Sequence, residues 1–182
     1  MADLGPAVFR DGPFSVTVAE HHYLFRHEPA ATWARALFAS SWILQVLHLM
    51  DPESYEEMLD RIQEGSVSQE HVRRIAHAAL ADAGGRPWWE VERLVRACGS
   101  NDGRLLGRVV LAGVDPARVT LAAFCAAVWA AATEGAGPED MLKMESMLTV
   151  PPPDALAEEA VPVENPDEVV ARLRQLPGVR LG

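Results

Sequence analysis

The chain has 182 residues, of which 49% are hydrophobic and 23% charged, so it can form one ordinary domain with a tail but not two large folds. Sixteen Lys and Arg against 26 Asp and Glu give a net charge of −10, which excludes the overall positive charge that dominates nucleic-acid binding. Two cysteines without a CxxC pair, and an N-terminus without a signal-peptide pattern, favour the cytoplasm. The most apolar stretches, 36–50 and 119–133, are shorter than the ~20 residues that span a bilayer, so no membrane segment is expected.

A β-hairpin is predicted near the N-terminus. Residues 14–18 alternate apolar and polar side chains, and a second short strand, 23–25, follows across residues 19–22. Isolated hairpins are marginally stable in water. We therefore expect this one to pack on the helices or on a copy of itself.

A long helix and a capped shorter one are predicted next. Residues 30–50 form one helical stretch, bent near Ser40-Ser41. Asp51 caps the following helix, which Gly65 ends. The apolar face predicted for this second helix consists of Tyr55, Leu59 and Ile62.

Helix-start and helix-stop residues divide the rest of the chain. The predicted helices run from Ser68 to Gly84-Gly85, from Pro87 to Gly99, over 104–112, over 121–133 after the cap Thr120, and over 139–148. The helix over 121–133 is the most apolar, and we expect it at the centre of the core.

The predicted fold class is mainly α, a compact bundle of about six or seven helices with a small N-terminal β-hairpin. Residues 1–150 form this helical domain. Residues 151–182 are predicted to be a Pro-rich acidic linker followed by a short C-terminal helix over 166–176. The apolar side of that terminal helix consists of Val169, Val170, Leu173 and Leu176.

Signatures of catalysis, cofactors and metals are missing from the sequence. The six histidines show no three- or four-residue spacing on a helix, and no nucleophile elbow, P-loop or dinucleotide-binding motif occurs. The densest polar cluster, 20–22 with 27–28, is predicted to be a solvated turn and strand end. Cys98 and Cys125, among apolar neighbours, are predicted to be buried structural thiols. We expect no enzyme activity, no cofactor and no metal.

Two features favour a protein partner. Trp88 and Trp89 are adjacent on a predicted helix, and their side chains diverge by about 100°, so one of them lies at an edge or interface, or at a core rim covered by the tail. The stripe Val169, Val170, Leu173 and Leu176 must dock on the body of the chain or on another chain. A local excess of arginines between 73 and 108 either solubilises the helices or contacts nucleic acid or an acidic segment, such as the chain's own tail.

The order of four segments resembles the tail assembly chaperones of tailed phages that infect actinobacteria, which are encoded ahead of the tape measure gene. The likeness covers roughly residues 14–153 in pattern. The segments are Pro29-Ala-Ala-Thr-Trp-Ala-Arg-Ala36, Gly85-Arg-Pro-Trp-Trp89, Gly113-Val-Asp-Pro-Ala-Arg-Val-Thr-Leu-Ala-Ala123 and Pro151-Pro-Pro153.

This resemblance implies a non-enzymatic protein of the host cytoplasm that binds the tape measure protein during tail morphogenesis, in some members also made as a longer, frameshifted form. The alternative is a virion structural component, such as a head–tail connector or a minor tail protein. Both hypotheses predict association with a partner or as a homo-oligomer. In the chaperone hypothesis, the terminal helix on its tether covers an apolar groove until the client displaces it.

Overall fold

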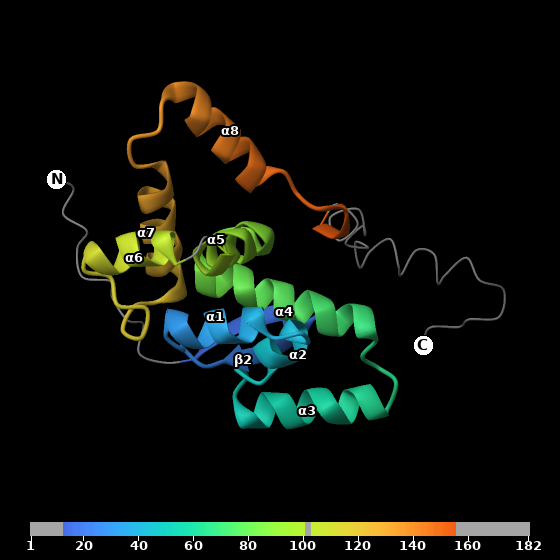
Figure 1. Cartoon of the computed structure of the whole chain (residues 1–182). Coiled ribbons are helices and arrows are strands. Elements are labelled where there is room, and N and C mark those ends of the chain that lie inside the picture. Colours follow the sequence, from blue (N-terminus) through green and yellow to red (C-terminus); the bar gives the residue numbers. More distant parts are fainter. Residues whose placement is uncertain (1–12, 101–102, 156–182) are drawn as a thin grey trace. The chain divides into compact units, whose positions relative to one another are not determined.

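A computed structural model describes residues 13–100 and 103–155 of the chain. This part is mainly helical with one two-stranded antiparallel sheet near its start, which confirms the predicted fold class (Figure 1). The chain divides after Val150 into two parts, and all elements named below lie in the first. In chain order they are β1 (Phe14–Val18), β2 (His21–Phe25), α1 (Ala30–Phe38), α2 (Trp42–Leu47), α3 (Pro52–Gln63), α4 (Gln69–Gly84), α5 (Trp88–Ser100), α6 (Arg104–Leu111), α7 (Leu121–Thr133) and α8 (Pro138–Thr149).

The hairpin is tighter than the sequence predicted. Ala19 and Glu20 alone form the connection, with φ angles of 49° and 65°. Two consecutive residues at positive φ are typical of the type I′ turn, whose twist matches that of the strands. His21 therefore pairs with Val18 at the start of β2 instead of lying in the turn.

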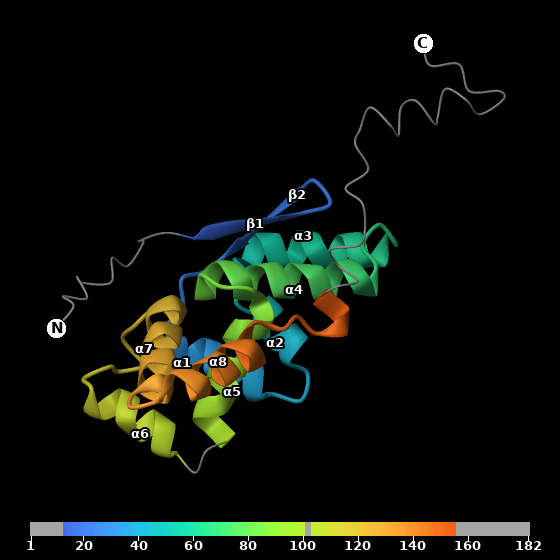
Figure 2. The ribbon, with the colours of Figure 1, turned by 90° about the horizontal axis from the view of Figure 1, so that it is seen from above.

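The hairpin packs on helices through its apolar face. The β1 residues Phe14, Val16 and Val18 are buried, and β1 packs against α4. The ring of Phe14 stacks on Phe25 with centroids 5.6 Å apart and lies 6.3 Å from the ring of Trp33. Figure 2 shows the hairpin beside α3 and α4. Within this chain the hairpin is therefore supported by helices, which is the first of the two supports that we expected.

The predicted long helix over 30–50 is wrong, because the chain breaks at residues 39–41 instead of bending. Ala39 is extended (φ −71°, ψ 149°), and a new helix, α2, begins at Trp42. The break lets α2 pack against α4. There the indole of Trp42 stacks on the ring of His77, with centroids 5.6 Å apart.

The cap of α3 is confirmed, but its predicted apolar face is wrong. Asp51 accepts a hydrogen bond from the Glu53 N–H, as expected of an N-cap. The buried residues are Ser54 and Met58, whereas Leu59 and Ile62 are 38% and 39% exposed. The Ser54 hydroxyl accepts a hydrogen bond from the Leu24 N–H of β2, so the hairpin edge sets the rotation of α3. Met58, one turn further along, then points inward.

Two glycines mark close approaches of helices. A Cβ on Gly84 would lie 2.3 Å from a methyl carbon of the buried Val91, so glycine is what lets the end of α4 meet α5. Gly99 does not end α5 as predicted but lies within it, under the ring of Phe38.

The apolar helix α7 lies at one side of the core and not at its centre. Its buried side carries Leu121, Phe124, Cys125 and Val128, and Ala126 and Ala130 are exposed. The Thr120 cap is confirmed, since its hydroxyl accepts a hydrogen bond from the Ala123 N–H. Within residues 13–100 and 103–155, no helix is both long and apolar enough to cross a bilayer.

Candidate functional site

An apolar groove with a volume of about 410 Å³ lies among helices α5, α6, α7 and α8. We call it the α5–α8 groove. Ten residues line it, nine apolar and one basic. They are Arg93, Leu94, Ala97, Leu105, Val128, Trp129, Ala132, Met144, Met147 and Leu148.

Small side chains keep this groove open between α5 and α7. On α5, Leu94 and Ala97 face the groove, while Val91 and Val95 are buried in the core. On α7, Ala132 lies one turn beyond Val128 on the same face. Because alanine extends only one carbon beyond the backbone, these positions leave space that leucine would fill. The groove is therefore encoded by the alanine content of two helices.

The third wall, α8, presents apolar side chains to solvent as well as to the groove. Pro138 at its first turn, followed by Glu139 and Asp140, explains why the helix begins there. Among the described elements α8 packs chiefly against α5 (Figure 1). Leu142 and Met147 are 67% and 76% exposed, so the apolar surface continues from the groove onto the outside of α8. An exposed apolar surface of this kind typically marks an interaction site.

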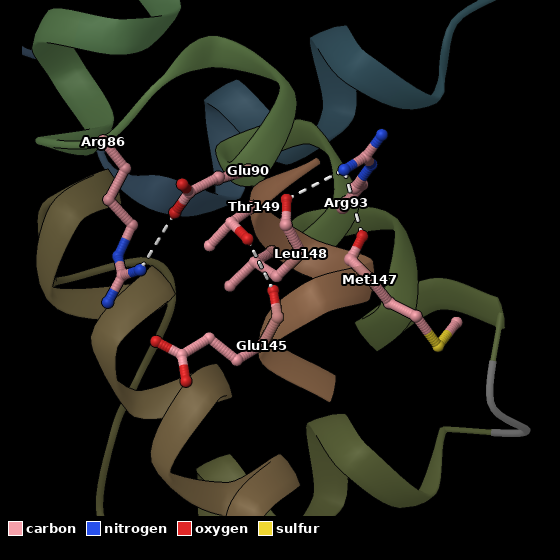
Figure 3. Close-up of polar contacts among 7 residues, drawn as sticks. All are labelled: Arg86, Glu90, Arg93, Glu145, Met147, Leu148 and Thr149. Carbon is pink, nitrogen blue, oxygen red and sulfur yellow. Dashed lines mark hydrogen bonds and ion pairs between the residues drawn. The ribbon is translucent and has the colours of Figure 1, made fainter. Parts of the chain in front are cut away.

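Arg93 holds the end of α8 against α5. Its Nη1 donates hydrogen bonds to the carbonyl oxygens of Met147 and Leu148, at 3.0 and 2.8 Å (Figure 3). The same Nη1 also donates to the carbonyl oxygen of Val150, at 2.6 Å. The last carbonyls of a helix lack partners within the helix and carry partial negative charge, so a guanidinium there is favourable. The only basic residue of the lining is thus a structural clamp, and it sets the width of the groove at this end.

The structure places the two predicted tryptophans away from the groove. Trp88 is buried, with its ring stacked on His77 at a centroid distance of 3.7 Å, and Trp89 is half-buried at right angles to it. The two Nε1 atoms are buried and have no hydrogen-bond partner within the part of the chain that the structure describes. Neither indole is an exposed anchor. A role of Trp88 or Trp89 in partner binding stays a prediction, and Val169, Val170, Leu173 and Leu176 lie outside the described residues.

Sequence reasoning missed the groove residues on α5, α7 and α8. Leu94 and Val128 are buried and line the groove as well, and Trp129 is half-buried. The pattern of an apolar stripe in the sequence is the same whether the stripe is covered or open. The signal available in the sequence was the pair Met147-Leu148, because adjacent apolar residues on a helix cannot both face one core. In the structure Leu148 is buried and Met147 is exposed.

The histidine and acidic cluster of the hairpin is dispersed. His21 and His22 are neighbours in β2 and so point to opposite faces of the sheet. His22 Nδ1 lies 2.9 Å from the Thr17 hydroxyl on the exposed face. In residues 13–100 and 103–155, no three His, Cys, Asp or Glu side chains gather as a metal ion would require.

The arginine excess between 73 and 108 is largely balanced within the body by ion pairs. Arg86 pairs with the buried Glu90 at 3.1 Å and Arg96 with Glu92 at 2.9 Å. Arg96 and Glu92 are four residues apart on α5, a spacing that brings side chains together on a helix, whereas Arg86 precedes α5 and reaches forward to Glu90 in its first turn. Arg108 of α6 pairs with Glu134 at 2.7 Å. These pairs favour the solubilising role over contact with nucleic acid.

The two cysteines are free and buried, as predicted. Burial raises the pKa of Cys98 to about 11 and that of Cys125 to about 12, in the latter against the opposing effect of Arg86. At pH 8 a thiol of pKa 11 is deprotonated in about one molecule in a thousand, and the thiolate is the reactive form. We expect iodoacetamide to leave both thiols unmodified in the folded protein and to alkylate them in urea, as measured by mass spectrometry. Rapid alkylation of the folded protein would contradict this prediction.

The groove is therefore the site that the described residues assemble best: an apolar cleft with one structural guanidinium and without a group of the kind that performs chemistry. The alanines and the hydrogen bonds of Arg93 keep the groove open. The exposed apolar side chains of α8 beside it suit an apolar partner. The chain matches no protein-family model, no curated protein and no solved structure.

Proposed function

We propose that the chain is a non-enzymatic tail assembly chaperone of a tailed phage, and that it binds a helical segment of the tape measure protein in the α5–α8 groove. The observation that carries the proposal is the apolar lining of this groove together with the exposed Leu142 and Met147 beside it. A tape measure protein is a long helical chain, which exposes apolar stripes until tail subunits assemble around it. A protein that holds such a stripe needs an open apolar surface, and the groove supplies one.

The chemistry of the groove favours an amphipathic helix as its occupant. Helices bind in apolar grooves through side chains spaced three and four residues apart. Met144 and Met147 have unbranched, flexible side chains, which can adapt to stripes of different shape. A long client offers many related stripes instead of one, and an adaptable wall suits that task.

Charge favours a client helix whose flanks are basic. The chain carries a net charge of −10, and exposed Glu139, Asp140 and Glu145 lie along α8, where Lys143 is paired with Glu139. Complementary charge speeds association and selects among partners. The same negative charge opposes non-specific aggregation while apolar surface is exposed.

A substitution that fills the groove is expected to weaken binding of the client. The variant Ala132→Phe places a ring in the groove, whereas Ala130→Phe places the same ring on the exposed side of the same helix. We expect Ala132→Phe to weaken binding of the tape measure protein by about tenfold or more, because it occupies the space of a client side chain, and Ala130→Phe to bind as the unchanged chain does. Isothermal titration calorimetry measures both. Equal affinity of the two variants, or no binding by the unchanged chain, would contradict the proposal.

Residence in the virion separates this function from that of a head–tail connector or minor tail protein. A chaperone leaves before the particle is complete, whereas a structural component stays. Mass spectrometry of purified virions is expected to detect the tape measure protein without this chain. Stoichiometric recovery of the chain with the virion would favour the structural role.

A further inference from the structure

Within residues 13–100 and 103–155, β2 is the only strand paired with β1, so the other edge of β1 has no strand partner there. On the other side of the hairpin, both backbone groups of Leu24 point away from β1: its N–H donates to the Ser54 hydroxyl (3.1 Å) and its carbonyl accepts from the Asp51 N–H (2.9 Å). Leu24 is opposite Ser15, so these two residues form a pair without mutual backbone hydrogen bonds. Alternation along an antiparallel ladder then turns the N–H and C=O groups of Ser15 and Thr17 outward.

These four outward groups have no hydrogen-bond partner within the part of the chain that the structure describes. The side chains of Ser15 and Thr17 are exposed. Backbone polar groups in folded proteins are paired with protein or with water, so this edge is hydrated or occupied by another strand. Natural edges are commonly protected by charges, prolines or bulges, and β1, with the sequence Phe-Ser-Val-Thr-Val, has no charge and no proline.

We propose that two copies of the chain associate through this edge, β1 against β1, antiparallel and with the two-fold axis at Val16. In this register Ser15 of each copy lies opposite Thr17 of the other, and the two pairs exchange four N–H···O=C hydrogen bonds. Every outward group of both edges is then satisfied. No other antiparallel register pairs all four groups of each copy.

The side chains match in the same register. On the buried face Phe14 lies opposite Val18 of the second copy and Val16 lies opposite itself, so apolar side chains meet apolar ones. On the exposed face Ser15 meets Thr17, and no like charges face each other. The product is a four-stranded sheet supported by α4 of both copies, in place of two hairpins of marginal size. Because both faces of β1 are complementary to themselves in this register, the partner that fits the edge best is a second copy of the chain. The two-fold symmetry is closed, so the assembly stops at a dimer.

Charge swaps at positions 15 and 17 test the register. The variant Ser15→Lys with Thr17→Lys places two pairs of like charges across the axis, and Ser15→Lys with Thr17→Glu places two pairs of opposite charges there. Within one chain these positions face Leu24 and His22, so both variants alter the hairpin at the same sites. Circular dichroism checks that both full-length proteins fold.

Sedimentation equilibrium of the full chain is expected to show a dimer whose dissociation constant rises about tenfold or more in the Lys/Lys variant and is retained in the Lys/Glu variant. Hydrogen exchange of the Ser15 and Thr17 amides is expected to slow as the protein concentration rises. A chain that stays monomeric at every concentration would overturn the proposal. So would a Lys/Lys variant that dimerises as tightly as the unchanged chain, a Lys/Glu variant that does not dimerise, or association that leaves these two amides unprotected.

Discussion

Replacing Arg93 with alanine is expected to release the end of α8 and to weaken client binding by about tenfold or more. The guanidinium donates to three carbonyl oxygens at 2.6–3.0 Å, those of Met147, Leu148 and Val150. Hydrogen bonds to a charged group contribute about 1.5–3 kcal/mol each when buried, and Arg93 is only half-buried, so we expect a total loss of about 2 kcal/mol. The groove then loses the wall that carries Met144 and Met147.

Arg96→Ala is the matched control for this experiment. Arg96 lies one turn from Arg93 on the same helix, but its side chain pairs with Glu92 at 2.9 Å instead of with the carbonyl groups of α8. Such a pair contributes roughly 0.2–1 kcal/mol. Urea denaturation measures the free energy of unfolding, and hydrogen exchange of the α8 amides reports release of the helix. Equal effects of the two substitutions on α8 exchange would show that Arg93 is not the clamp.

Gly84→Ala is expected to destabilise the protein by about 1–3 kcal/mol, although alanine is a better helix former than glycine. The new methyl would lie 2.3 and 2.9 Å from the two methyl carbons of Val91, which is fully buried. Valine is branched at Cβ and has few alternative rotamers, so α4 and α5 must move apart. The cost of overpacking exceeds the roughly 1 kcal/mol gained in helix propensity.

Gly99→Ala is expected to leave the free energy of unfolding nearly unchanged, because the side chain that the new methyl group meets can move. Its Cβ would lie 2.2 Å from Cζ of Phe38, at the far end of a ring that is 51% exposed. The ring can rotate into solvent, and the gain in helix propensity offsets the lost contact, so we expect a change within about 0.5 kcal/mol. Urea denaturation of both variants compares them directly. A Gly84→Ala variant as stable as the unchanged chain would show that the two helices separate easily.

The ends of the helices could be predicted from the sequence because they are decided by neighbouring residues. Asp51 and Thr120 each accept a hydrogen bond from the first turn of the helix that follows, and Gly85, at φ 63°, ends α4. The hairpin followed likewise from alternation over residues 14–18. Such signals act over three or four residues, so they are legible without knowledge of the fold.

The faces of the helices were decided by tertiary contacts. For α3 the pattern favoured Leu59 and Ile62, but the hydrogen bond from Leu24 to Ser54 rotates the helix and buries Met58. The break between α1 and α2 is equally non-local, because it lets the indole of Trp42 reach His77 on α4.

The candidate site is formed by residues that lie far apart in the sequence, so it was the hardest feature to predict. Arg93 and Val150 are far apart along the chain, and each looks ordinary in its own segment, one as a surface arginine and the other as the end of an apolar run. Only the packing of α8 on α5 brings the guanidinium to the helix end and leaves the space beside it open. The sequence by itself determined a helical, acidic chain whose helices begin and end at recognisable caps. Which apolar stripes are covered and which stay open was decided by the tertiary structure, because the energy of a buried side chain depends on what packs against it and not on its neighbours in the chain.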